Sequence, residues 1–214
     1  MRKETSPLIN LTKEELKILK KLSTPIKIQD WLDTVPLNYE KGGETYMSPR
    51  RALRENKMHC LEGALVAALC LWLQGEEPLL LDLKAPQDID HVVALYQRNG
   101  YWGAISKTNH AALRFRDPVY KTIRELTLSY FNEYFDNKTR KKTLRSYAGP
   151  YNLKRLGIEW ITTEKDLFSL PVILDELPHK EVFPKVNARY LRLADKMELK
   201  AGSFVEWGRD NKLT

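Results

Sequence analysis

Two residues of this sequence, Cys60 and His91, could together carry out nucleophilic chemistry. Cys60 begins the apolar run CLEGALVAALCLWL, which is typical of a buried helix, and His91 begins the run HVVALY, which is typical of a strand. The free amide groups and the macrodipole at a helix start favour the thiolate, which is the form of cysteine that attacks carbonyl carbons. Cysteine acyl-transfer enzymes use such a Cys–His pairing. The alternative is that Cys60 is a small hydrophobic residue of the core.

Four stretches of the sequence follow one another in the order of a known family of thiol enzymes. They are Cys60-Leu-Glu-Gly-Ala, the run PLLLDL at residues 78–83, Asp90-His91-Val-Val-Ala and Gly100-Tyr-Trp102-Gly-Ala-Ile. Over roughly residues 45–110 this order resembles the transglutaminase-like core of the papain-like cysteine protease superfamily. The resemblance implies a helix carrying the cysteine, packed on an antiparallel sheet carrying the histidine. It further implies that both residues act on a peptide, or on a small amide or ester, through an acyl-enzyme that needs neither metal nor cofactor.

The third catalytic residue departs from the pattern of that family. In the family an Asp or Asn typically stands four positions after a strand tryptophan, whereas Ser106 stands four positions after Trp102. Asn109 is the other candidate, if the strand has already bent into a loop there. Ser106 or Asn109 could orient the imidazole but would supply no negative charge, so we expect a slow site, one specialised for an activated substrate, or an inactive one.

The Asn99-Gly100 pair predicts a β-hairpin that returns the chain beside His91. With a two-residue turn, Thr108 lies opposite His91; with a four-residue loop, Ser106 does. Both registers place Ser106, Thr108 and His91 on the same face of the sheet.

Further residues could line the cleft or form an oxyanion hole. The backbone N–H of Cys60 is one candidate donor, and Asn56 could offer a second amide, although turn chemistry explains Asn56 equally well. His59 either lines the cleft or faces solvent at the helix start. Glu62, in the first helical turn, is expected to cap the helix. The remaining candidate cleft residues are Asp90 and Trp102.

Helices and short strands are expected to position these residues. Capping signals at Thr12, Thr24 and Ser48 predict three helices before the Cys60 helix, which ends at Gly75. The other expected elements are strands over residues 78–83, 91–96 and 101–105, a helix from Pro118 to Phe135, and a helix after Thr163. The sequence therefore predicts an α+β fold.

The chain length suits one domain, or one domain with an appendage. Of its 214 residues 43% are hydrophobic, which is enough for a substantial core. A basic linker begins near residue 138. We therefore expect a transglutaminase-like domain with an N-terminal helical cap over residues 1–137, and a helical C-terminal extension over residues 138–214 that is packed on it or appended to it.

The two cysteines favour a reducing compartment. Cys60 and Cys70 are ten residues apart in the same expected helix, or about 15 Å, which is too far for a disulfide bond. No export signal opens the sequence, and the longest apolar run, of ten residues, is too short to cross a membrane. A cytoplasmic protein with no membrane contact is expected, and no metal-ligand spacing is found.

A net charge of +7 supports a second hypothesis. In this hypothesis the fold is retained with a decayed site, and a basic face binds nucleic acid or another acidic partner. Tyr147 and Tyr151 would be available for base stacking, although no nucleic-acid-binding motif accompanies them. The basic residues concerned are Arg114, Arg116, Lys138, Arg140, Lys141, Lys142 and Arg145.

Overall fold

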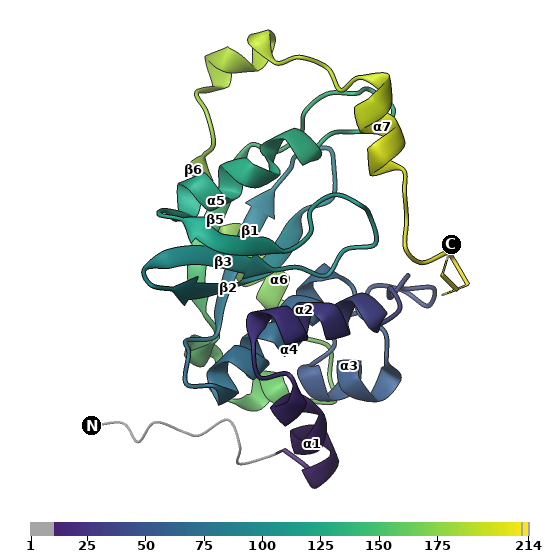
Figure 1. Ribbon diagram of the computed structural model, residues 1–214, viewed down its shortest axis with the longest axis vertical. Coiled ribbons are helices and arrows are strands. Elements are labelled where there is room, and N and C mark those ends of the chain that lie inside the picture. The colour runs from purple at the N-terminus through teal and green to yellow at the C-terminus, as the bar shows by residue number, and fades with distance from the viewer. Residues whose placement is uncertain (1–10, 211, 214) are drawn as a thin grey trace.

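A six-stranded antiparallel sheet forms the centre of the protein, with the strand order β4-β3-β2-β1-β5-β6. The structure is a computed structural model that describes residues 11–210 and 212–213. Helices α1 to α4 gather on one side of the sheet and α5 lies on the other (Figure 1). The expected α+β class is confirmed. The strands are β1 Leu79–Lys84, β2 His91–Arg98, β3 Tyr101–Ile105, β4 Arg116–Tyr120, β5 Ser146–Asn152 and β6 Lys180–Glu181.

The N-terminal helices begin where their capping residues predict. Thr12, Thr24 and Ser48 each accept a backbone N–H bond at the start of a helix. The helices are α1 Lys13–Lys21, α2 Pro25–Thr34, α3 Pro49–Glu55, α4 Cys60–Leu73, α5 Ile123–Tyr130, α6 Ser169–Glu176 and α7 Lys196–Gly202. Short 3-10 helices span Phe131–Glu133, Leu153–Leu156, Glu159–Ile161 and Lys185–Tyr190.

Helix α4 is the central helix of the larger core. All of its residues from Leu61 to Leu71 are buried, so it is apolar on every side, as a helix surrounded by other elements must be. It packs against β2 through that strand's Val92 and Ala94, and against α1, α2 and α3. This packing brings the start of α4 to the start of β2.

The hairpin between β2 and β3 has a two-residue turn. Arg98 pairs with Tyr101, and the left-handed φ values of Asn99 (51°) and Gly100 (81°) suit the tight turn that an Asn-Gly pair favours. Of the two predicted registers, the one with Thr108 opposite His91 therefore continues the observed pairing, in which Ala94 lies opposite Ile105.

The predicted helix from Pro118 to Phe135 is wrong in its first part. Residues Arg116–Tyr120 form β4 at the edge of the sheet, where a proline costs no ladder hydrogen bond. Helix α5 begins only after Thr122, whose hydroxyl accepts from the N–H of Glu125 in a capping box. The prediction is also wrong at its end, because α5 stops at Tyr130, Phe131 belongs to a 3-10 helix and Phe135 forms an isolated bridge with Lys142.

The C-terminal part of the chain adds to the sheet. Strand β5 is hydrogen-bonded to β1, and β6 to β5, so both lie in the same sheet as the strand carrying His91. Strand β5 occupies residues that the sequence suggested as a basic linker. Helix α6 begins at Ser169, and the segment over residues 163–168 before it is irregular. The division at residue 138 stays a prediction.

A close contact between α4 and the chain after β3 leaves no room for a side chain at Gly63. A β-carbon built there would lie 2.4 Å from the Lys107 β-carbon. The Lys107 ammonium is buried and donates to the Leu32 and Val35 carbonyls at the end of α2, which holds its side chain in place.

We therefore expect Gly63→Ala to lower the free energy of unfolding by about 1–3 kcal/mol, the usual effect of overpacking a core. Urea unfolding followed by circular dichroism measures this change. The matched control is Gly42→Ala, because nothing lies within 4 Å of a β-carbon built there. Equal stability of the two variants would contradict the expectation.

Candidate active site

The start of α4 and the start of β2 meet beside a cavity of about 330 Å³. Cys60 lines this cavity and is half-buried, as the first residue of α4. His91 is buried as the first residue of β2. The structure thus brings together the two residues that the sequence proposed as a catalytic pair.

Two imidazoles near the Cys60 thiol, those of His59 and His91, act on its pKa. Burial on its own raises the pKa of the thiol, but hydrogen bonds and positive charge from both rings outweigh burial and hold that pKa well below its usual value. Cys70, in the same helix, has only apolar surroundings, and burial raises the pKa of its thiol. The two cysteines therefore differ in chemistry because they differ in neighbours.

Ser106 fixes which nitrogen of His91 carries the proton. The Ser106 hydroxyl donates its single hydrogen to the Leu113 carbonyl, at 2.5 Å. At the His91 Nε2 atom, 2.7 Å away, the same oxygen can therefore only accept, so Nε2 is protonated. Nδ1 is then the nitrogen left free to exchange a proton with Cys60. These hydrogen bonds are compatible with the orienting role predicted for Ser106, which stays a prediction.

The side chain of Gln29 holds Ser106 in position. Its amide oxygen accepts from the Ser106 N–H at 2.9 Å, and its amide nitrogen donates to the Ser106 carbonyl at 2.8 Å. Gln29 comes from α2 and was not identified from the sequence. Gln29 is distinguished from the other polar residues of α2 only by its burial, and the burial of one residue cannot be read from a single sequence.

His59 lines the cavity beside Cys60, which settles its two predicted positions in favour of the cleft. Its Nε2 atom lies 2.7 Å from the Thr45 carbonyl oxygen, and its Nδ1 lies 3.2 Å from the Leu61 nitrogen at the helix start. Burial lowers the pKa of the ring, but the Cys60 sulfur, the Glu62 carboxylate and the Thr45 carbonyl raise it to about 9. As the cap of α4 the ring accepts the Leu61 N–H at Nδ1, and when Nδ1 takes up a proton it releases that N–H and His59 becomes a second source of positive charge for the thiolate.

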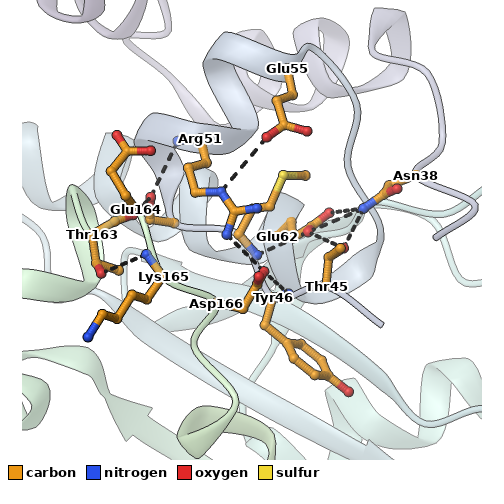
Figure 2. A network of polar contacts seen from close by, with 12 residues as sticks. Asn38, Thr45, Tyr46, Arg51, Glu55, Glu62, Thr163, Glu164, Lys165 and Asp166 are labelled. Atoms are coloured by element: carbon orange, nitrogen blue, oxygen red, sulfur yellow. Dashed lines mark hydrogen bonds and ion pairs between the residues drawn. The ribbon is translucent and has the colours of Figure 1, made fainter. Parts of the chain in front are cut away.

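Glu62 is the fully buried acceptor that holds the start of α4. As predicted, it caps the helix, and its carboxylate accepts from the His59 N–H at 2.9 Å. It also accepts from the Asn38 amide, the Thr45 hydroxyl and the Met47 N–H, at 3.1 Å each (Figure 2). Glu62 thereby fastens the loop over residues 38–47 to the helix that carries Cys60.

A segment from the C-terminal half of the chain braces the same loop. The Asp166 carboxylate accepts from the Tyr46 N–H at 2.8 Å and pairs with Arg51 at 2.9 Å (Figure 2). The Leu167 N–H donates to the Tyr46 carbonyl at 2.8 Å. Residues 163–168 therefore hold Tyr46, which lines the cavity, in place.

The two predicted oxyanion donors differ in whether their N–H groups are already hydrogen-bonded. Among the described residues the Cys60 N–H has no hydrogen-bond partner, as expected of the first amide of a helix, so it is available to a ligand. The Asn56 N–H is bonded to the Ala52 carbonyl, and Asn56 ends α3 with a left-handed φ of 49°. Turn geometry therefore accounts for Asn56, and its N–H is not free.

Two other predicted site residues are used elsewhere. The Asn109 amide donates to the Trp207 carbonyl at 2.9 Å and accepts from the Trp207 N–H at 2.7 Å, so it anchors the C-terminal segment. Trp102 pairs with Gln97 near the far end of β2. Because a strand advances about 3.3 Å per residue, this position is on the order of 20 Å from His91. The structure brings neither residue to the imidazole.

Asp90 does lie at the site, at the end of the loop before β2. Its carboxylate accepts from the Ala85 N–H at 2.7 Å and pairs with Lys84 at 2.6 Å, and it lines the cavity. Asp82 also lines the cavity and lies 3.0 Å from His179 Nε2. This second carboxylate–imidazole pair was missed, because its partners come from β1 and from the loop after α6.

Most of the proposed basic face is engaged within the molecule. Arg114 pairs with Asp33 and Glu206, Arg116 with Glu133, and Lys142 with Glu198, while Arg145 lies over the ring of Phe183. Tyr147 and Tyr151 are buried, so neither is available for base stacking. The exposed members of the cluster are Lys138, Arg140 and Lys141.

Within residues 11–210 and 212–213, no group of three or more His, Cys, Asp or Glu side chains is placed to hold a metal ion. In the same part of the chain, no helix combines the length and apolar character needed to span a bilayer.

Comparison with known proteins does not assign the chain to a family. No family model matches the sequence, and a search of curated proteins gives no match either.

We expect Cys60 to react with iodoacetamide as a thiolate with a midpoint well below pH 8.5, the value of an ordinary thiol. The rate is measured against pH in a Cys70→Ala background. His91→Ala and His59→Ser should each move the midpoint upward, because each removes one imidazole; serine at position 59 keeps a good helix cap. A midpoint at or above 8.5 that ignores both substitutions would show that Cys60 is only a packing residue.

Proposed function

We propose that this protein is a thiol-dependent hydrolase or acyl transferase with a transglutaminase-like core, in which Cys60 is the nucleophile and His91 the general base and acid. The observation that carries the proposal is the position of Cys60, which lines a cavity and has its pKa lowered by His91, while His91 is itself hydrogen-bonded to Ser106. The three residues match a nucleophile, a base and an orienting group. A cysteine used only for packing has no need of a base held in one tautomer.

The first half of the reaction forms an acyl-enzyme. The Cys60 sulfur attacks the carbonyl carbon of an amide or ester, and the electron pair of the carbonyl moves onto its oxygen. The free Cys60 N–H stabilises that oxyanion. When the intermediate collapses, the bond to the leaving group breaks, and the amine or alcohol departs with a proton from His91 Nδ1.

The second half releases the acyl group. His91 Nδ1 takes a proton from water as the water oxygen attacks the thioester carbon. The carbon–sulfur bond then breaks, the carboxylic acid leaves, and the thiolate is restored beside the two imidazoles. If an amine or alcohol replaces water, the same steps transfer the acyl group to it.

The neutral Ser106 defines what the pair can do. An ionised third residue would stabilise the imidazolium, and Ser106 supplies orientation without that charge. Protonated His59 adds a second cation near the sulfur, so the thiolate is stabilised by a second ring. We therefore expect rapid acylation by activated carbonyls and slow release.

The proposal is tested with 4-nitrophenyl acetate as an activated ester. The Cys70→Ala protein should show a burst of one nitrophenolate per chain, then slow turnover, and mass spectrometry should find the acetyl group on Cys60. Cys60→Ala should lose both phases. Ser106→Ala should lower turnover by about 10² because the imidazole tautomer is no longer fixed, within the range that general base catalysis contributes.

The outcome that would refute the proposal is specific. Acetylation of other residues only, or a Cys60 acetyl group whose release is unchanged in His91→Ala, would mean that no catalytic pair exists.

A further inference from the structure

The cavity beside Cys60 differs in charge from the rest of the molecule. The chain as a whole carries a net charge of +7. The cavity wall instead holds five carboxylates, from the loop over residues 38–47, from β1, from the loop before β2 and from α6. They are Glu40, Glu44, Asp82, Asp90 and Asp175.

Internal partners neutralise only part of this charge. Asp82 pairs with His179, Glu40 lies 3.9 Å from His59 Nε2, and Asp90 and Asp175 share the single ammonium of Lys84, at 2.6 and 2.5 Å. Glu44 is exposed and makes no hydrogen bond or ion pair within the described residues. A surplus of negative charge therefore faces the cavity.

The uncharged part of the cavity wall would suit an aliphatic chain. Leu61, Val92, Pro171 and Leu174 supply apolar surface beside the carboxylates. Tyr46 also lines the cavity, and its ring extends away from the polar network that holds its backbone (Figure 2). Carboxylates together with an aromatic face are what a bound ammonium or guanidinium group requires.

The position of His91 decides which part of the substrate enters this cavity. A second cavity, of about 170 Å³, is lined by His91 and not by Cys60, and Ile89 and Asp90 line both cavities. The leaving group must take its proton from His91, so it belongs on the His91 side. The acyl group therefore lies on the Cys60 side, among the carboxylates.

We propose that the acyl group of the substrate bears an aliphatic chain ending in a cation, such as the side chain of a lysine or arginine. This inference rests on the proposed function for the role of Cys60 as nucleophile. The charge preference of the cavity can be tested separately from catalysis.

The first experiment measures charge preference alone. In a Cys70→Ala background, Cys60 is modified with a cationic reagent, trimethylammonium-ethyl methanethiosulfonate, and with an anionic one, sulfonatoethyl methanethiosulfonate. Each rate is divided by the rate at which the same reagent modifies β-mercaptoethanol in solution. The cationic reagent should be favoured. Glu44→Gln should lower the preference by roughly two- to fivefold, the effect of an exposed ion pair. The control Glu176→Gln removes an equal charge from an exposed residue of α6 outside the cavity lining and should leave the ratio unchanged.

The second experiment measures turnover of the 4-nitrophenyl esters of N-acetyl-lysine, N-acetyl-norleucine and N-acetyl-glutamate. The lysine ester should have the highest kcat/KM. Glu44→Gln should lower the ratio of kcat/KM for the lysine ester to kcat/KM for the norleucine ester. No cation preference with the thiol reagents, or a norleucine ester equal to the lysine ester, would overturn the inference. Cation preference without turnover of any ester would instead refute the proposed function and leave the charge preference standing.

Discussion

The site depends on one buried carboxylate, that of Glu62. Its two oxygens satisfy the Asn38 amide, the Thr45 hydroxyl and the backbone N–H groups of Met47 and His59. An unsatisfied buried donor costs about 1–3 kcal/mol, and that is the cost of leaving the Met47 or the His59 N–H without the Glu62 carboxylate. The start of the helix and the loop beside it are therefore one unit, and the nucleophile belongs to it.

The two imidazoles beside the sulfur have separate constraints. His91 is held from the strand side through Ser106, so its orientation depends on Gln29 and the Leu113 carbonyl. His59 is held from the helix side through the Thr45 carbonyl. Because different elements hold the two rings, a change that disturbs one need not disturb the other. Thiolate formation and proton transfer can thus be separated by mutation.

Local chemistry explains what could be predicted from the sequence. Helix caps and an Asn-Gly turn act within a few residues, so the start of α4 and the β2–β3 hairpin were predicted correctly, and with them the positions of Cys60 and His91. Gln29 lies 77 positions from Ser106, and Asp82 lies 97 from His179. Such contacts depend on how the sheet and helices assemble, which periodicity in a single sequence does not encode.

The bracing of Tyr46 by Asp166 and Leu167 has a consequence for how the protein is made. A nascent chain that has not yet released residue 168 from the ribosome lacks that brace, and β1 lacks its neighbour until β5 emerges. The loop that presents the Thr45 carbonyl to His59 is then fastened at one side only. The help that His59 gives to the thiolate therefore depends in part on residues that are synthesised late in the chain.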